Sequence, residues 1–171
     1  EFGFWRQFAK TGLLEFEKKA YRQHIRAGMC VLDVGCGCGR ETVVLLNKGC
    51  RVFAIDLVPQ MARHTLIACD RDENLQTAVA DIVEGVPSNT SFDAAVLPEQ
   101  LYHHIPKRSD RVKALGHICK ALRPQGKVLL SVFNEGNIEV SARLLWLFQT
   151  HFELARSIVL YDSNLLDARY R

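Results

Sequence analysis

The stretch Val31–Gly39 reads Val-Leu-Asp-Val-Gly-Cys-Gly-Cys-Gly, an apolar run that ends in alternating glycines. A second apolar run, Val52–Ile55, leads directly into Asp56. In dinucleotide-type folds, glycines directly after a strand bring bare backbone against a ligand, and a carboxylate about 20 residues later binds a ribose diol. These two segments therefore predict a site for an adenosine-containing cofactor.

The spacing of the glycines separates two kinds of cofactor. The nicotinamide fingerprint G-x-G-x-x-G would need its third glycine at position 40, where this chain has Arg40. Glu41 falls in the first turn of the expected helix, where it would repel a pyrophosphate. A ligand that carries an amino acid and a sulfonium is compatible with Glu41. The alternative without any ligand is a tight strand-to-helix turn, with Asp56 as a helix cap.

Five sequence blocks, in this order and spacing, resemble those of class I S-adenosylmethionine-dependent methyltransferases. The blocks are Val31–Gly39, Ala54–Met61, Val79–Ile82, Ser91–Val96 and Leu122–Leu130. The resemblance covers roughly residues 28 to 134 and extends to members that act on small molecules, including those of quinone biosynthesis. It implies an α/β fold with a doubly wound, mostly parallel sheet, S-adenosyl-L-methionine as cofactor, and in-line methyl transfer. A member that binds the cofactor without catalysis is the alternative.

The same resemblance assigns residues to the cofactor. They are Asp33, Gly35, Cys36, Gly37, Gly39, Asp56, Leu57, Asp81, Ile82 and Leu97. The glycine loop would pass beneath the amino acid part, so that a side chain at Gly37 would occupy the space of the ligand. Asp33 would accept hydrogen bonds from the backbone or from the ammonium group, or would only cap the turn.

At the adenosine end, the resemblance implies that Asp56 accepts both ribose hydroxyls and that Leu57 presses on the adenine. Asp81 would accept from the adenine amino group, or would only cap its loop, and Ile82 would offer its backbone N–H to the ring. The backbone near Leu97 would line the methionine part.

A turn with two histidines, His103 and His104, follows the fourth predicted strand. Imidazole titrates near neutrality, so either residue is a candidate general base for the acceptor, and a packed or capping histidine is the alternative. Glu99 and Tyr102 are secondary candidates for contact with the acceptor.

Alternating short strands and helices predict a parallel sheet. Strands are expected at 30–34, 51–55, 75–80, 92–97, 127–133 and 157–161, and helices at 40–48, 59–69 and 108–122 and within 4–26 and 138–155. Three N-terminal aromatic residues, Phe4, Trp5 and Phe8, would form either a lid over the sulfonium or ordinary core.

The length of 171 residues fits one methyltransferase domain. Within it we expect an N-terminal helical cap at 1–27, a cofactor-binding core at 28–134 and a helical, substrate-related region at 135–171. Only about 37 residues follow the fifth strand, whereas the family usually ends in a helix and an antiparallel strand pair. Either the chain is a fragment or its sheet edge is abbreviated, and the oligomeric state stays open.

The net charge of +3 does not indicate nucleic-acid binding, which would need clustered basic residues. A small or medium-sized acceptor is therefore the leading expectation. The run His103–Leu115 is nevertheless similar to wobble-uridine tRNA methyltransferases, so a tRNA acceptor is an alternative. A non-catalytic subunit that activates a partner is another, and an open edge at the fifth strand would favour it.

The six cysteines do not form two closely spaced ligand pairs, so no metal site is expected. Reduced thiols in a reducing compartment are the simplest account, and no secretory leader is visible. The sequence contains no stretch of 18 uncharged apolar residues, so we expect no membrane span. Together these features predict a cytoplasmic protein.

Overall fold

The computed structural model describes residues 3, 7, 9–98, 101–132 and 158–162. Its elements are α2 (Glu15–His24), β1 (Cys30–Val34), α3 (Arg40–Asn47), β2 (Arg51–Asp56), α4 (Pro59–Ala68), β3 (Leu75–Val79), β4 (Phe92–Leu97), α5 (Leu101–His104), α6 (Arg108–Ala121), β5 (Leu122–Val132) and β6 (Ile158–Asp162). The aromatic residues proposed as a lid, Phe4, Trp5 and Phe8, lie outside these residues, as do Glu99 and the helix expected within 138–155.

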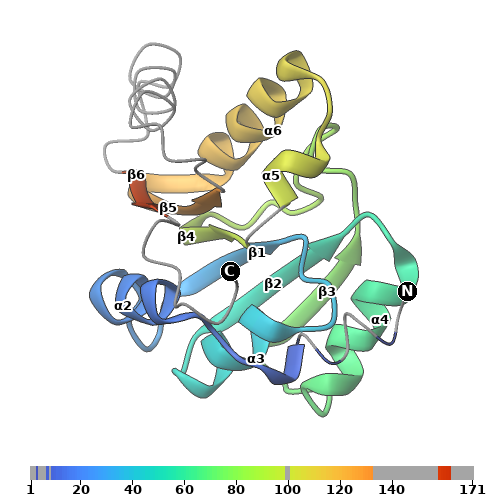
Figure 1. The fold of residues 1–171 in the computed structure, drawn as a ribbon, viewed down its shortest axis with the longest axis vertical. Helices are drawn as coiled ribbons and strands as arrows, with labels where there is room; N and C mark the ends of the chain where they lie inside the picture. The colour runs from blue at the N-terminus through green and yellow to red at the C-terminus, as the bar shows by residue number, and fades with distance from the viewer. Residues whose placement is uncertain (1–2, 4–6, 8, 99–100, 133–157, 163–171) are drawn as a thin grey trace.

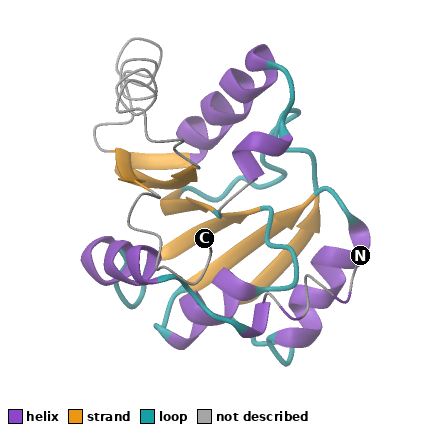
Figure 2. Cartoon of the chain, viewed as in Figure 1, coloured by secondary structure: helices purple, strands orange, loops and turns teal. Residues whose placement is uncertain are grey.

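The described strands form one sheet in the order β3-β2-β1-β4-β5-β6, and every neighbouring pair is parallel. The sheet runs through the centre of the molecule, with α3 and α4 on one side and α5 and α6 on the other (Figure 1). Figure 2 shows the same layering by type of element. The expected doubly wound α/β fold is confirmed.

Each face of the sheet has its own core. Val31, Ala54 and Val96 pack with Leu45 of α3 and Tyr21 of α2 on one side. Alternate positions of the same strands point to the other side, where they pack against α6. Because helices cover both faces, all five residues of β1 are buried.

Two elements differ from the sequence-based expectation. The strand expected at 127–133 begins at Leu122, which pairs with Phe92; the pairing then shifts and resumes at Lys127 opposite Ala94. The ladder is continuous only from Lys127, where the apolar run begins, which is why the earlier pairing was not predicted. The short helix α5 was expected to be a turn, because four residues carry no helical period.

The strand β6 pairs with β5 in parallel, with Val128 opposite Ile158. The strand expected at 157–161 is therefore present, shifted by one residue. Since β6 covers the side of β5 away from β4, β5 is not an open edge of the sheet.

Candidate cofactor and acceptor site

The backbone of the glycine loop is fixed by β2 and α4. The N–H groups of Gly35 and Cys36 both donate to the carbonyl oxygen of Ile55, at 2.8 and 3.0 Å. Thr65 of α4 donates its hydroxyl to the carbonyl oxygen of Gly37 at 2.9 Å. These three hydrogen bonds hold the loop from two sides, and none of them involves the N–H of Gly37.

All three glycines of the loop have left-handed backbone, with φ of +74° at Gly35, +55° at Gly37 and +89° at Gly39. Residues with a Cβ rarely adopt this conformation. A Cβ at Gly35 would lie 2.7 Å from the Leu101 side chain, and one at Gly39 would lie 3.3 Å from Thr65. At Gly37 the nearest atom would be the Gly35 carbonyl oxygen, 4.0 Å away. Only Gly37 faces open space that a ligand would fill.

Asp56 connects the glycine loop to the end of β2. Its carboxylate accepts the N–H of Gly37 at 2.9 Å and the N–H of Val58 at 2.8 Å. Each carboxylate oxygen can accept a second hydrogen bond, and the side chain is only partly buried. Asp56 therefore stabilises the loop and keeps acceptor capacity for a ligand diol.

Two apolar side chains lie exposed beside Asp56. Leu57 is 64 % exposed, and Val79, at the end of β3, is 54 % exposed. Val79 lies opposite Asp56 in the register of the two strands. Val79 was not predicted as a site residue from the sequence, although its position two residues before Asp81 was a usable signal. Exposed apolar groups at neighbouring strand ends suit a flat ring such as adenine.

Asp81 caps its own loop, because its Oδ1 accepts the N–H of Val83 at 2.8 Å. Its neighbour Ile82 is buried, and the carbonyl oxygen of Ile82 lies 3.2 Å from Nδ1 of His117 on α6. The capping role considered for Asp81 is present in the structure. The carboxylate retains capacity to accept from a ligand as well.

Asp33 is fully buried at the end of β1. Thr42 of α3 donates its hydroxyl to Asp33 Oδ2 at 2.5 Å, whereas Oδ1 has no protein partner in the part of the chain that the structure describes. Burial, reinforced by the nearby Glu41 carboxylate, raises the pKa of Asp33 to about 8. An unsatisfied buried oxygen fits a ligand with several donors, such as an ammonium group.

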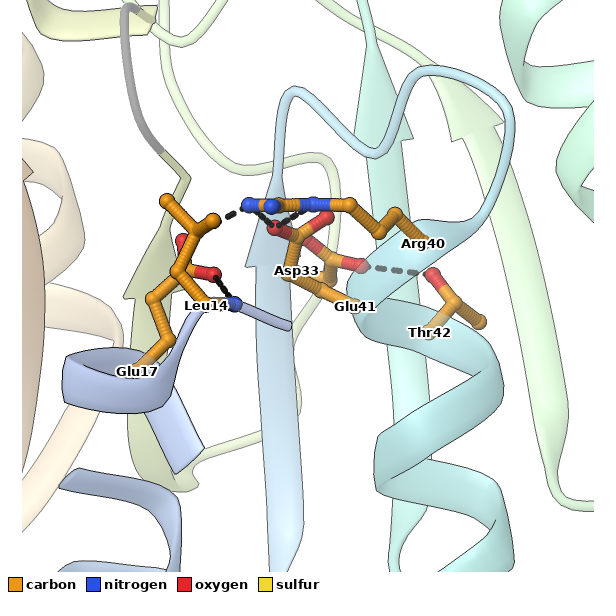
Figure 3. Close-up of polar contacts among 6 residues, drawn as sticks. All are labelled: Leu14, Glu17, Asp33, Arg40, Glu41 and Thr42. Carbon is orange, nitrogen blue, oxygen red and sulfur yellow. Dashed lines mark hydrogen bonds and ion pairs between the residues drawn. The ribbon is translucent and has the colours of Figure 1, made fainter. Parts of the chain in front are cut away.

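A buried ionic cluster joins α2 to the start of α3 (Figure 3). Arg40 donates from Nη2 to Glu17 Oε1 at 2.7 Å and from Nε to Glu41 Oε1 at 2.8 Å. All three side chains are at most 6 % exposed. Glu17 also accepts the N–H of Leu14 at 2.7 Å, which caps α2. We call Glu17, Arg40 and Glu41 the buried ionic cluster.

Burial raises the pKa of Glu17 to about 7, because the nearby Arg40 guanidinium offsets only part of the cost of desolvation. Burial also raises the pKa of Tyr21, and the Glu41 carboxylate adds to that shift. The position of Glu41 corrects one step of the sequence argument. Its side chain is buried and paired with Arg40, so it does not face a ligand at the start of α3 as expected.

The two histidines lie on the exposed side of α5 and do not enter the core. Tyr102, which precedes them in α5, is buried, and the Arg111 guanidinium lies 5.8 Å from the centre of its ring. Partial burial lowers the pKa of His103, and the positive charge of Arg111 adds to the effect. His103 is therefore neutral at pH 7 and able to accept a proton.

A narrow cavity lies between α2 and the carboxyl ends of β4 and β5. It is lined by Phe16, Glu17, Ala20, Tyr21, Leu97, Pro98, Leu129, Leu130 and Ser131. Ser131 is 9 % exposed, and its Oγ has no partner among the described residues. Leu97, expected to line the methionine part of the cofactor, is buried at one wall of this cavity. In the described ranges, no three His, Cys, Asp or Glu side chains are grouped to hold a metal ion.

A family model described as a methyltransferase domain matches residues 31–126, more than half of the chain. The chain belongs to this methyltransferase family. The match contains the glycine loop, four of the five residues of β1, and the whole of β2, β3 and β4. The identification as a class I S-adenosylmethionine-dependent methyltransferase, made above from five sequence blocks, is confirmed.

Two curated relatives are similar in sequence to this methyltransferase domain over part of their length. The tRNA (carboxymethyluridine(34)-5-O)-methyltransferase of Arabidopsis thaliana is 27 % identical over 81 % of this chain and 33 % of its own length. The ubiquinone biosynthesis O-methyltransferase of Xylella fastidiosa (strain M23) is 34 % identical over 63 % of this chain and 43 % of its own length. The chain thus spans between a third and a half of these relatives.

The fold is also that of a solved methyltransferase. A TehB-like SAM-dependent methyltransferase from Corynebacterium glutamicum superposes with a TM-score of 0.70, at 24 % identity. The match covers 87 % of this chain and 79 % of the other. Methyltransferase family members with this architecture use S-adenosylmethionine, and the site fits that group in three respects. These are the open space at Gly37, the spare acceptor capacity of Asp56 and the unsatisfied Oδ1 of Asp33.

Proposed function

We propose that this chain transfers a methyl group from S-adenosyl-L-methionine to a small or medium-sized acceptor. One observation carries the proposal: the only glycine of the loop that faces open space, Gly37, donates its N–H to the carboxylate of Asp56. A ligand against Gly37 would thus lie beside the carboxylate expected to bind its ribose. The family match supports the reaction type.

The cofactor would lie along the carboxyl ends of β1, β2 and β3. We propose that Asp56 accepts the ribose hydroxyls and that Leu57 and Val79 contact the adenine ring. Asp81 would accept from the adenine amino group, while the ammonium group would donate toward Asp33. The exposed apolar surface of Leu57 and Val79 supports the placement of the ring.

When bound, the cofactor supplies a methyl group activated by its sulfonium, so the protein needs mainly to align the acceptor. Such alignment contributes on the order of 7–11 kcal/mol in favourable systems. We propose His103 as the residue that accepts the proton of the acceptor, since its pKa is lowered and its side chain is accessible. His104, next to it, is the second candidate.

Calorimetry with S-adenosylhomocysteine tests the cofactor site, and transfer of a labelled methyl group to a metabolite extract tests the activity. Binding without transfer would reduce the function to cofactor binding. No heat with the folded protein would refute the proposal. A His103→Ala variant should lower the transfer rate about a hundredfold, as expected for loss of a general base, with the affinity for S-adenosylhomocysteine unchanged.

A tRNA acceptor is the second candidate, and the Arabidopsis relative favours it because that similarity covers 81 % of this chain. Lys107 and Arg108 are exposed at the start of α6, three to five residues after the candidate bases His103 and His104. A gel shift with bulk tRNA that weakens steeply between 50 and 200 mM salt would support this acceptor. Absence of any shift at low salt would exclude it for this chain.

A non-catalytic role as an activating subunit has less support. An open edge at the fifth strand would favour it, but β5 pairs with β6. Size-exclusion chromatography with light scattering distinguishes the two roles, because a monomer that turns over an acceptor needs no catalytic partner.

We propose a single methyltransferase domain with the cap at 1–27, the core at 28–134 and the substrate-related region at 135–171, in the cytoplasm. The cap is supported by α2, which packs on the same core as α3. None of the six cysteines, all of which lie in the described ranges, is in a disulfide, which supports a reducing compartment. None of the helices in the described ranges is long and apolar enough to cross a membrane.

A further inference from the structure

The cavity between α2 and the ends of β4 and β5 has both the position and the chemistry of a binding site. We propose that this acceptor cavity receives the reacting group of the methyl acceptor and selects an uncharged hydroxyl on an apolar body over an anion. The inference rests on the proposed function and names the class of acceptor. Tyr21 and Ser131 are the residues that would recognise the hydroxyl.

The position follows from the two strands that form one wall. Ligands of open α/β sheets bind at the carboxyl ends of the strands. Leu97 ends β4 and Pro98 follows it; both line the cavity, and the methionine part of the cofactor is expected against the same residues. The cavity therefore adjoins the place where the transferable methyl group would lie.

The other wall is held in place by buried charge. Glu17 and Tyr21 of α2 line the cavity, and Glu17 is ion-paired with Arg40 at 2.7 Å. Arg40 directly follows Gly39, so the wall is fixed to the end of the glycine loop. A fixed wall orients a bound acceptor relative to the cofactor.

The charge around the cavity disfavours anions. Three buried carboxyl groups, those of Glu17, Asp33 and Glu41, act on the Tyr21 hydroxyl, and the Arg40 guanidinium partly offsets their effect. Burial raises the pKa of both Glu17 and Asp33. A carboxyl group is either negative or neutral, so neither residue can form an ion pair with an anion. Because Arg40 already pairs with Glu17 and Glu41, it does not compensate the charge of an incoming carboxylate or phosphate.

The lining also favours one neutral polar group on an apolar body. Six of the nine lining residues have apolar side chains that cannot form hydrogen bonds: Phe16, Ala20, Leu97, Pro98, Leu129 and Leu130. Ser131 Oγ is buried without a partner among the described residues, and such a hydroxyl is satisfied when a ligand hydroxyl reaches it. The cavity is narrow, so it would admit the reacting end of the acceptor and not its whole body.

Phenol and benzoate test this inference, because they share a ring and differ in charge. Each is titrated into protein saturated with S-adenosylhomocysteine and followed by ligand-observed NMR. We expect the Kd of phenol to be at least tenfold lower than that of benzoate. Tyr21→Phe and Ser131→Ala should each raise the Kd of phenol threefold or more. Glu17→Gln should lower the ratio of the benzoate Kd to the phenol Kd.

Glu15→Gln is the matched control, because Glu15 lies on α2 outside the cavity and pairs with Lys18 at the surface. It should leave the phenol affinity unchanged. Equal affinity for benzoate, or phenol binding that neither Tyr21→Phe nor Ser131→Ala alters, would overturn the inference. If Ser131→Ala does not fold, Tyr21→Phe alone decides. Failure of S-adenosylhomocysteine to bind overturns the proposed function itself, whereas normal cofactor binding without selection overturns only this inference.

Discussion

The glycine loop and the buried ionic cluster both lie around the end of β1, yet they are held by different forces. The loop is held by backbone hydrogen bonds to Ile55 and to the partly exposed Asp56. The cluster is held by ion pairs between side chains 23 residues apart, Glu17 and Arg40. The loop depends on conformations that only glycine adopts readily, whereas the cluster depends on charges that have lost their water.

This difference predicts different responses to substitution. Backbone geometry at the loop affects the ligand without much effect on the rest of the fold. Buried charges affect stability, because a charge left without its partner inside the protein is costly. The four predictions below test this contrast, in order of decreasing effect.

The largest effect is expected from Gly37→Val in the loop. A side chain there would enter the open space expected for the ligand, and φ of +55° is unfavourable for valine. Calorimetry should show the affinity for S-adenosylhomocysteine falling more than a hundredfold. Gly28→Val is the matched control: Gly28 also has positive φ, +81°, with open space around it, but lies before β1 at the other end of the sheet. Equal loss of affinity in both variants would contradict the placement of the ligand.

The next effect is expected from Arg40→Met in the cluster. Two buried carboxylates, Glu17 and Glu41, would lose their partner, and urea denaturation should show a loss of about 3 kcal/mol in the free energy of unfolding. Arg123→Met removes an exposed ion pair to Asp93 and should cost at most about 1 kcal/mol.

Adding Glu17→Gln to the Arg40→Met variant sharpens the test of the cluster. It removes one of the two unpaired charges and should restore part of the lost stability. If Arg40→Met is no more costly than Arg123→Met, the cluster does not hold α2 in place.

A smaller effect is expected from Asp56→Asn. A charge-assisted hydrogen bond is worth about 1.5–3 kcal/mol, so the affinity for S-adenosylhomocysteine should fall roughly ten- to a hundredfold. The amide has one acceptor oxygen, so it can accept the N–H of Gly37 or that of Val58 but not both, and the free energy of unfolding should fall by about 1 kcal/mol. Asp81→Asn, which keeps its local cap to Val83, should weaken binding less. If the free energy of unfolding falls by more than the free energy of S-adenosylhomocysteine binding, the role of Asp56 is mainly structural.

The smallest effect is a pH dependence of stability that comes from the cluster. The pKa of Glu17 is raised by burial from 4.5 to about 7, so the folded state binds this proton more tightly than the unfolded chain. The stabilisation is fully present below about pH 4.5 and is lost as the pH rises through 7. Urea denaturation should therefore show that the free energy of unfolding decreases less from pH 5 to pH 8 in Glu17→Gln than in the parent protein. Identical decreases would contradict the raised pKa.

The sequence determined those features that depend on short-range patterns. Strands β1 and β4 have the expected bounds, because apolar runs between turn residues define buried parallel strands. The alternating glycines and Asp56 were also recognisable, since a left-handed turn after a strand requires glycine at fixed positions. The family followed from the order of these local patterns along the chain.

Only the tertiary structure decided which charged residues are buried and what they contact. Glu17 lies in a polar helix and Glu41 in a helical first turn, and both would be expected to face water. Their burial with Arg40 arises because α2 brings Glu17 against Arg40 at the start of α3, a contact between distant segments that no local pattern encodes. The acceptor cavity has the same origin, since α2, β4 and β5 meet there only in the folded chain.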